Sequence, residues 1–151
     1  MIGLLQRVLH AKVEVAGKKI SAIEKGLLVF VGIEKNDTSV EANRLLERLL
    51  CYRVFPDERG KMNKSLQDIN GGLLLVPQFT LPADTNKGNR PSFSSAAAPQ
   101  EGARLFEVVL KKAEKAYSNV AAGLFGADMQ VSLTNDGPVT FWLQVPPLGN
   151  S

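Results

Sequence analysis

A short polar motif after an apolar run is the first candidate for chemistry. Gln78-Phe79-Thr80 directly follows residues 73–76, a stretch that predicts a buried strand. Catalytic groups are frequently found on loops that a rigid sheet positions, and strand ends provide such loops. The same motif also fits a plain strand end with a satisfied threonine, so these residues alone leave both interpretations open.

A second candidate lies in the long polar segment of residues 82–98. Loops longer than about 12–15 residues in compact domains are usually functional or disordered. This one carries Arg90 and Phe93, and a cation near an aromatic ring suits phosphate contact and base stacking with a nucleotide. Solvated loop side chains are the plainer interpretation of the same two residues.

The segment Asn135-Asp136-Gly137-Pro138 separates two stretches that alternate apolar and polar residues. Glycine lets backbone approach closely and proline fixes φ, so such a segment can form a rigid backbone element. A hairpin turn is the plainer interpretation. Because only about 5–6% of X–Pro bonds are cis, the residues by themselves favour a trans peptide before Pro138.

Two more residues could carry acid–base or nucleophilic chemistry. His10, the only histidine, lies between two expected strands, where an exposed or structural role is the simpler interpretation. Cys51 lies in a leucine-rich helical stretch and is expected to be a buried, inert thiol. No His, Cys and carboxylate cluster has metal-ligand spacing and no glycine-rich phosphate motif is present, so neither metal nor cofactor is expected.

The amino-acid composition narrows the kinds of protein to which the sequence can belong. With 151 residues, 44% of them hydrophobic and 22% charged, the sequence fits one globular domain over residues 1–151. A formal net charge of +3 and a pI of about 9.1 favour a polyanionic partner such as nucleic acid. The absence of a long apolar run or signal peptide, with a single cysteine, predicts a cytoplasmic protein without membrane association.

Hydrophobic periodicity predicts the elements that must position these residues. Thr38 and Glu41 form a capping box ahead of helix-spaced leucines, and Pro99 suits the first position of a second helix. The strands are expected over residues 2–9, 12–15, 20–23, 27–33, 73–76, 129–133 and 139–145. Such strand runs separated by single helices predict an α+β domain, with a mixed, mainly antiparallel or barrel-like sheet and two main helices. The tail from about residue 146 is expected to fray.

Four short motifs, taken together and in order, resemble the D-aminoacyl-tRNA deacylase family, also described as D-tyrosyl-tRNA(Tyr) deacylases. Each motif is weak alone, but the four in the family's order cover about the whole chain. They are Gln6-Arg7-Val8, Gln78-Phe79-Thr80-Leu81, Gly88-Asn89-Arg90-Pro91-Ser92-Phe93 and Asn135-Asp136-Gly137-Pro138-Val139-Thr140.

The resemblance implies a hydrolase that cleaves the ester between a D-amino acid, or achiral glycine, and the 3′-terminal adenosine of tRNA. This is a chirality proofreading activity in translation. The resemblance also implies a homodimer with active sites at the subunit interface, a cis Gly137-Pro138 peptide that enters the partner's site, and no cofactor. Pro77 departs from the family, which usually has serine there; proline lacks the hydroxyl and the backbone N–H.

We predict that Thr80, Gln78 and Phe79 carry the catalysis. No credible base accompanies Thr80, so a threonine nucleophile is the minority hypothesis. Positioning of the ester, with backbone N–H groups near Phe79 and Thr80 stabilising the tetrahedral oxyanion, is the preferred mechanism. The resemblance adds the ribose 2′-hydroxyl of the substrate as a participant.

Chiral selection is assigned to Gly137 and Pro138, with Arg7 as a candidate to anchor them across the dimer. A rigid backbone element can block the direction of an L side chain without attracting each D side chain. Phe93 and Arg90 are expected to contact the terminal adenosine and its phosphates. Two alternatives stay open: a related deacylase that edits L- or achiral misacylated tRNA, and a non-enzymatic RNA-binding module, which an aromatic content of 7% disfavours.

Overall fold

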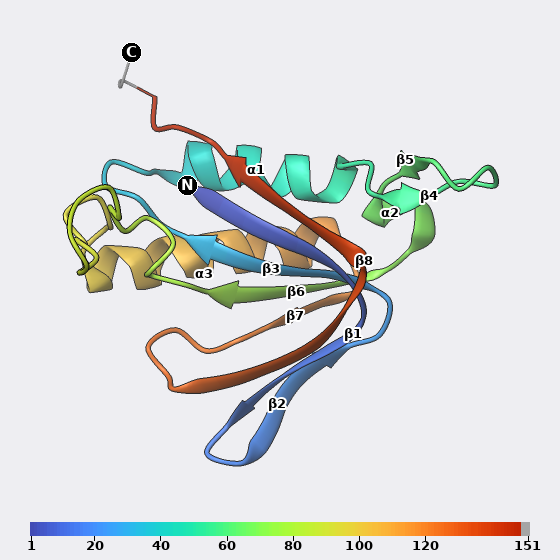
Figure 1. Ribbon diagram of the computed structural model, residues 1–151, viewed down its shortest axis with the longest axis horizontal. Helices are drawn as coiled ribbons and strands as arrows, with labels where there is room; N and C mark the ends of the chain where they lie inside the picture. Colours follow the sequence, from blue (N-terminus) through green and yellow to red (C-terminus); the bar gives the residue numbers. More distant parts are fainter. Residues whose placement is uncertain (149–151) are drawn as a thin grey trace.

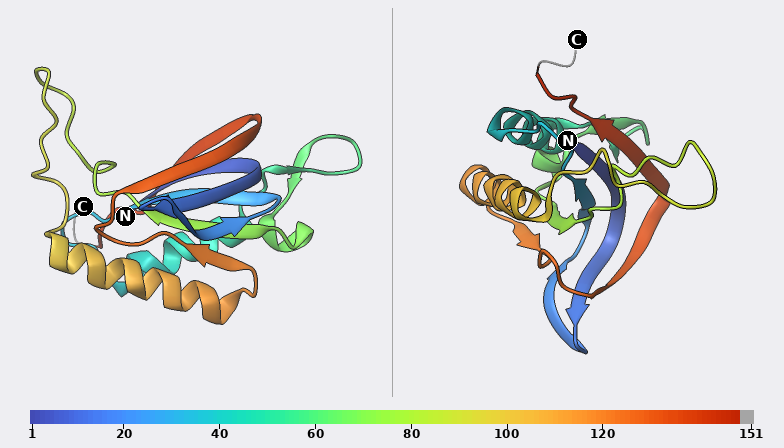
Figure 2. Two further views of the ribbon diagram at one scale, coloured as in Figure 1. Left: turned by 90° about the horizontal axis from the view of Figure 1, so that it is seen from below. Right: turned by 90° about the vertical axis from the view of Figure 1, so that its left-hand side faces the viewer.

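Strand β1 (Ile2–Val15) is the strand around which the sheet is built, as the computed structural model of residues 1–148 shows (Figure 1). Along one edge, β1 pairs with β3 (Gly26–Gly32) in its first half and with β2 (Lys18–Ile23) in its second half. Along the other edge it pairs with β8 (Met129–Gln144) from end to end. All three pairings are antiparallel, and the sheet curls strongly about β1 (Figure 2).

The far side of the sheet is parallel. Strand β3 pairs in parallel with β6 (Gly72–Pro77), and β6 pairs in parallel with β7 (Val120–Ala122). The remaining elements are α1 (Ser39–Cys51), β4 (Phe55–Pro56), β5 (Met62–Lys64), α2 (Leu66–Ile69) and α3 (Pro99–Ala116). The predicted α+β class, with a mixed, barrel-like sheet and two main helices, is confirmed; α2 adds a single short turn.

The central strands β3 and β6 are buried on both faces, which explains their continuous apolar sequences. Leu27 and Leu73 pack with the two long helices, whereas Leu28 and Leu74 pack inside the curl of the sheet. The helices cover the outer face with one apolar stripe each. These stripes are Ala42, Leu45, Leu46, Leu49 and Leu50 of α1, and Leu105, Phe106, Val109 and Ala113 of α3.

Strands β3 and β6 begin with glycines that face each other. Gly26 pairs with Gly72 in the parallel register. A Cβ atom added at Gly26 would lie 2.0 Å from the carbonyl oxygen of Gly72, far inside van der Waals contact. The two strands can therefore approach this closely only because residue 26 has no side chain.

The sequence expectations for three local features are corrected. β1 runs unbroken through His10, whose Nε2 lies 3.1 Å from the Thr134 hydroxyl; His10 is exposed, as expected, but does not lie between two strands. Cys51 is exposed rather than buried, because it lies about 100° around the helix from Leu50, beyond the buried stripe. Residues 135–138 form part of β8 instead of a hairpin turn.

Helix α1 begins at the capping box that the sequence predicts. The Thr38 hydroxyl accepts a hydrogen bond from Val40 N at 3.1 Å, and Glu41 accepts one from Thr38 N at 2.7 Å. Leu148 N also donates to the Glu41 carboxylate, at 3.1 Å. The tail that was expected to fray is therefore held as far as Leu148, while residues 149–151 lie outside the described part of the chain.

The Glu41 carboxylate predicts a pH-dependent stability. Burial opposes its ionisation, but hydrogen bonds from the Thr38 side chain and from the Leu148 and Thr38 backbones outweigh burial and hold the pKa of Glu41 below its usual value. A lowered folded-state pKa stabilises the fold above the unfolded pKa, and this stabilisation is lost as pH falls through the folded pKa. We expect Glu41→Gln to cost about 1 kcal/mol near neutral pH and much less in acid.

Thermal denaturation at about pH 7 and about pH 3 measures this difference. Glu107→Gln is the matched control, because Glu107 is exposed on α3 and lies 3.8 Å from Lys111, a surface pair expected to contribute little. A Glu41→Gln penalty of equal size at both pH values would contradict the assignment.

Candidate functional site

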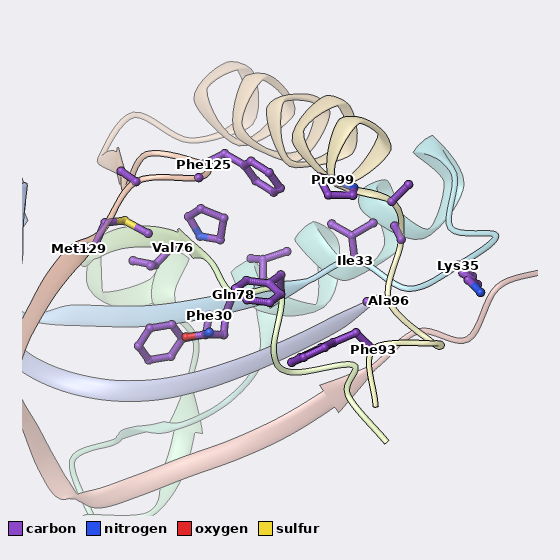
Figure 3. A pocket seen from close by; sticks show the side chains of 18 of the residues that line it. Phe30, Ile33, Lys35, Val76, Gln78, Phe93, Ala96, Pro99, Phe125 and Met129 are labelled. Carbon is purple, nitrogen blue, oxygen red and sulfur yellow. The ribbon is translucent and has the colours of Figure 1, made fainter. Parts of the chain in front are cut away.

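An apolar pocket of about 720 Å³ opens where β3 and β6 end (Figure 3). Its size lies within the range of about 300–1,000 Å³ that is typical of small-ligand pockets. The walls come from these two strands, from the start of β8 and from the segments that flank α3. The lining residues are Phe30, Val31, Ile33, Lys35, Val76, Pro77, Gln78, Phe79, Phe93, Ala96, Ala97, Ala98, Pro99, Gly102, Phe125, Gly126, Ala127, Met129 and Val131.

The predicted motif Gln78-Phe79-Thr80 forms a tight turn at the edge of this pocket. Gln78 N donates to the Val31 carbonyl at 2.8 Å, and Leu81 N donates to the Gln78 carbonyl at 3.3 Å. The Gln78 side-chain amide donates to the Thr80 hydroxyl. The pocket lining contains no carboxylate or imidazole, and among residues 1–148 the side chain that hydrogen-bonds the Thr80 hydroxyl is the Gln78 amide, which is not a base that could activate a nucleophile.

The backbone amides of Phe79 and Thr80 are free. Within residues 1–148, neither N–H donates a hydrogen bond to a carbonyl or to a side chain. The Phe79 side chain is 63% exposed, so the turn faces solvent. Neighbouring N–H groups without partners are the kind of donor that stabilises a developing oxyanion.

An aromatic contact brings the long loop to the same pocket. The rings of Phe79 and Phe93 lie 5.4 Å apart between centroids and are tilted by 43°. The loop between β6 and α3 extends away from the sheet (Figure 2), and Arg90 is exposed on it, outside the pocket lining. The structure therefore joins Phe93, but not Arg90, to the predicted catalytic turn.

Pro77 ends β6 and donates no hydrogen bond on the side of β7. Amide groups alternate in direction along a strand, and Gln78 N points to β3. The nitrogen of Pro77 consequently faces the other side, where Gly123, just after β7, still donates to the Leu75 carbonyl at 2.8 Å. Its ring forms part of the pocket wall.

Arg7 holds the segment around Gly137 within its own chain. Arg7 Nε donates to the Asp136 carbonyl at 3.1 Å, and Arg7 Nη1 donates to the Val54 carbonyl at 2.7 Å. Within one chain the two segments meet because β1 and β8 are neighbours in one sheet, and the expected anchoring across a dimer stays a prediction. The Gly137–Pro138 peptide is cis, as the family resemblance implies.

Asn135 positions the segment around Gly137, a role that was not predicted from the sequence. Its side-chain oxygen accepts a hydrogen bond from Val139 N at 2.7 Å, and its amide donates to the Thr140 hydroxyl at 2.8 Å. These two bonds close around Gly137 and Pro138. An asparagine before a Gly-Pro pair is the signal that could have identified it, because such side chains often bond to nearby backbone.

The turn of residues 78–80 and the Gly137–Pro138 segment lie apart within one chain. Thr140 pairs with Gln6, on the part of β1 that faces the beginning of β3. Pro77 instead pairs with Val31, at the end of β3 and on the far side of it. Strand spacing and rise place the two segments on the order of 20 Å from each other.

Nowhere in residues 1–148 are three or more His, Cys, Asp or Glu side chains gathered so that they could hold a metal ion. None of the helices in this range is both long and apolar enough to cross a membrane.

Comparison with known proteins gives consistent matches. The family model described as D-Tyr-tRNA(Tyr) deacylase matches residues 4–144. A protein named D-aminoacyl-tRNA deacylase from Pseudomonas putida is 61% identical over 145 residues, which cover 96% of this chain and 100% of that protein. Its namesake from Nitrosococcus oceani is 61% identical over 147 residues, covering 97% and 95% of the two chains.

Two solved structures share the fold. The c-Myc DNA Unwinding Element Binding Protein superposes with a TM-score of 0.93 at 40% identity, covering 97% of this chain and 99% of that one. A probable eukaryotic D-amino acid tRNA deacylase has a TM-score of 0.83 at 17% identity, covering 95% and 98%.

The Asn135 contacts predict a loss of stability on truncation. In Asn135→Ala the buried Val139 N–H loses its acceptor, which is expected to lower the free energy of unfolding by about 1–3 kcal/mol. Urea denaturation measures the loss, and amide hydrogen exchange at Val139 should accelerate. Asn43→Ala is the control, since the exposed Asn43 accepts only from Lys112 Nζ at 3.0 Å. Equal losses in the two variants would refute the role of Asn135.

Proposed function

From its place in the D-Tyr-tRNA(Tyr) deacylase family, to which the chain belongs, we propose that the pocket binds the aminoacylated 3′ end of tRNA. The protein is a D-aminoacyl-tRNA deacylase, a hydrolase that cleaves the ester between a D-amino acid and tRNA. The observation that carries the assignment of the site is the turn of Phe79 and Thr80, whose free amides border an apolar pocket. Glycine esters are further substrates, and the protein proofreads chirality in the cytoplasm.

The free amides fit the needs of ester hydrolysis. A water oxygen attacks the ester carbonyl carbon, and the carbonyl oxygen becomes an oxyanion that accepts hydrogen bonds from the Phe79 and Thr80 N–H groups. The attacking water gives up a proton, the intermediate collapses, the bond to the ribose oxygen breaks, and that oxygen takes up the proton released by the water. The products are the free amino acid and tRNA. In keeping with the family resemblance, the ribose 2′-hydroxyl of the substrate assists the attack in place of a side-chain base.

Gln78 and Thr80 position the reacting groups. The hydrogen bond from the Gln78 amide to the Thr80 hydroxyl fixes both side chains at the mouth of the pocket. An aminoacyl ester is already activated, so alignment and oxyanion stabilisation supply the catalysis. Phe93, 43% exposed beside Phe79, offers a face for the terminal adenosine. Arg90 contacts a phosphate farther from the ester.

Chiral selection requires a second copy of the chain. The Gly137–Pro138 segment is exposed and lies on the order of 20 Å from Thr80 in the same chain, beyond reach of the ester. We assign it to the pocket of a partner subunit, where its backbone blocks the direction of an L side chain. Trp142, 51% exposed on β8, and Leu9 on β1 supply apolar surface for such a homodimer.

Substrate assays separate this function from its alternatives. Wild-type protein is expected to hydrolyse D-Tyr-tRNA and Gly-tRNA and to spare L-Ala-tRNA. Gly137→Ala is expected to lower the ratio of D- to L-ester hydrolysis at least about tenfold. A Cβ at Gly137, whose φ is +139°, would lie 2.6 Å from Val139 Cγ2 and 3.3 Å from Arg7 Nη2, so the segment must move.

Gly60→Ala is the control, because Gly60 also has a positive φ, +77°, but its Cβ would meet nothing within 4 Å. Sedimentation equilibrium on the same samples tests the homodimer. Preferential hydrolysis of L-Ala-tRNA would favour the related editing deacylase. Binding of tRNA without hydrolysis of any ester would favour a nucleic-acid-binding module.

The Thr80 side chain separates positioning from nucleophilic catalysis. Thr80→Ala is expected to slow D-Tyr-tRNA hydrolysis by about ten- to a hundredfold, because the Gln78 amide loses its partner while the backbone N–H groups remain. Single-turnover assays measure the residual rate, with Thr85→Ala on the adjacent exposed loop as control. An acyl-enzyme trapped by acid quench in the wild type would overturn this mechanism in favour of a Thr80 nucleophile.

A further inference from the structure

Lys35 is the one charged side chain among the residues that line the pocket. It lies at the rim, at the end of the pocket remote from Met129 and beyond Ala96 (Figure 3). The walls are otherwise apolar or uncharged. For a charged group on a bound ligand, Lys35 is therefore the one charged side chain that the pocket lining offers.

The backbone around Lys35 is firmly attached to the segment that precedes α3. Lys35 N donates to the Ser95 carbonyl at 3.0 Å, and Ala97 N donates to the Ile33 carbonyl at 3.0 Å. Between these two bonds, Glu34 and Ala96 form an antiparallel bridge. The position of Lys35 at the rim is consequently fixed by the fold, although its side chain keeps its freedom.

The Lys35 ammonium has no carboxylate partner among residues 1–148, because its acidic neighbours are engaged elsewhere. Glu34 binds the Met1 ammonium at 2.8 Å and accepts from the Gln144 side chain at 2.9 Å. Asp37 binds the same Met1 ammonium at 2.8 Å. The positive charge at the rim is thus left for a ligand.

The proposed substrate has opposite charges on either side of the ester. The amino acid carries an α-ammonium, whereas the ribose carries a 5′-phosphate that continues into the tRNA chain. A lysine repels the former and attracts the latter. Building on the proposed function, we propose that Lys35 binds the phosphate on the 5′ side of the terminal adenosine and so sets the direction in which the acceptor end enters the pocket.

Two small esters that differ by one phosphate test this role. The substrates are adenosine and adenosine 5′-phosphate, each carrying D-tyrosine on the 3′-oxygen. In the wild type, the phosphate is expected to lower KM, and Lys35→Gln is expected to reduce this KM advantage about tenfold. Lys35→Arg should retain most of the advantage. With D-Tyr-tRNA, Lys35→Gln should also lower the slope of log(1/KM) against log salt by about 0.7, the value of one phosphate contact on a single strand.

Lys111→Gln on α3 removes the same charge far from the pocket rim and should leave the KM advantage of the phosphate unchanged. An unchanged advantage in Lys35→Gln, or an equal loss in Lys111→Gln, would overturn the assignment of Lys35 alone. If the wild type hydrolyses neither ester nor D-Tyr-tRNA, the proposed function fails together with the assignment.

Discussion

Buried backbone N–H and C=O groups need hydrogen-bond partners, and β1 provides them for three other strands of the sheet. One edge of the strand is divided between β3 and β2, and the other is occupied throughout by β8. The pairings of this 14-residue strand with β2 and β8 contain register shifts, which bend a sheet locally. The curl of the sheet and the two long helices together bury β3 and β6 on both faces, and the carboxyl ends of these strands open onto the pocket.

The pocket combines apolar walls with a few polar groups at its edge. Hydrogen bonds are stronger electrostatically where water is excluded, so the free amides of Phe79 and Thr80 are most useful beside such walls. The aromatic contact between Phe79 and Phe93 ties the long loop to the same place. The proposed stabilisation of the oxyanion by backbone groups would allow a site without a lining base to act on an ester that is already activated.

Hydrophobic periodicity and capping motifs in the sequence predicted the local secondary structure well. The capping box at Thr38, the start of α3 at Pro99 and the apolar run of β3 all appear where periodicity and capping rules put them. Cys51 was misassigned because composition around a residue does not say which face of the helix it occupies. Its exposure depends on where the buried stripe of α1 ends.

Contacts between distant segments could not be predicted in the same way. Arg7 and Asp136 are separated by 129 residues, and only the pairing of β1 with β8 brings them together. The same pairing turns residues 135–138 into part of a strand, although their sequence is typical of a turn. The family resemblance pointed to Gly137 and Pro138 as a unit that enters the partner's site, but the contact from Arg7 to this unit within one chain follows only from the pairing of β1 with β8.

At the position where β3 and β6 begin, the structure leaves no room for a side chain on residue 26. A side chain at residue 26 would meet the backbone of Gly72, and no second substitution can trim a backbone atom. Accommodation would instead require β6 to shift, carrying Pro77 and the turn of residues 78–80 away from Val31. The shape of the pocket edge therefore depends on the absence of a side chain at a residue that is not part of the pocket lining.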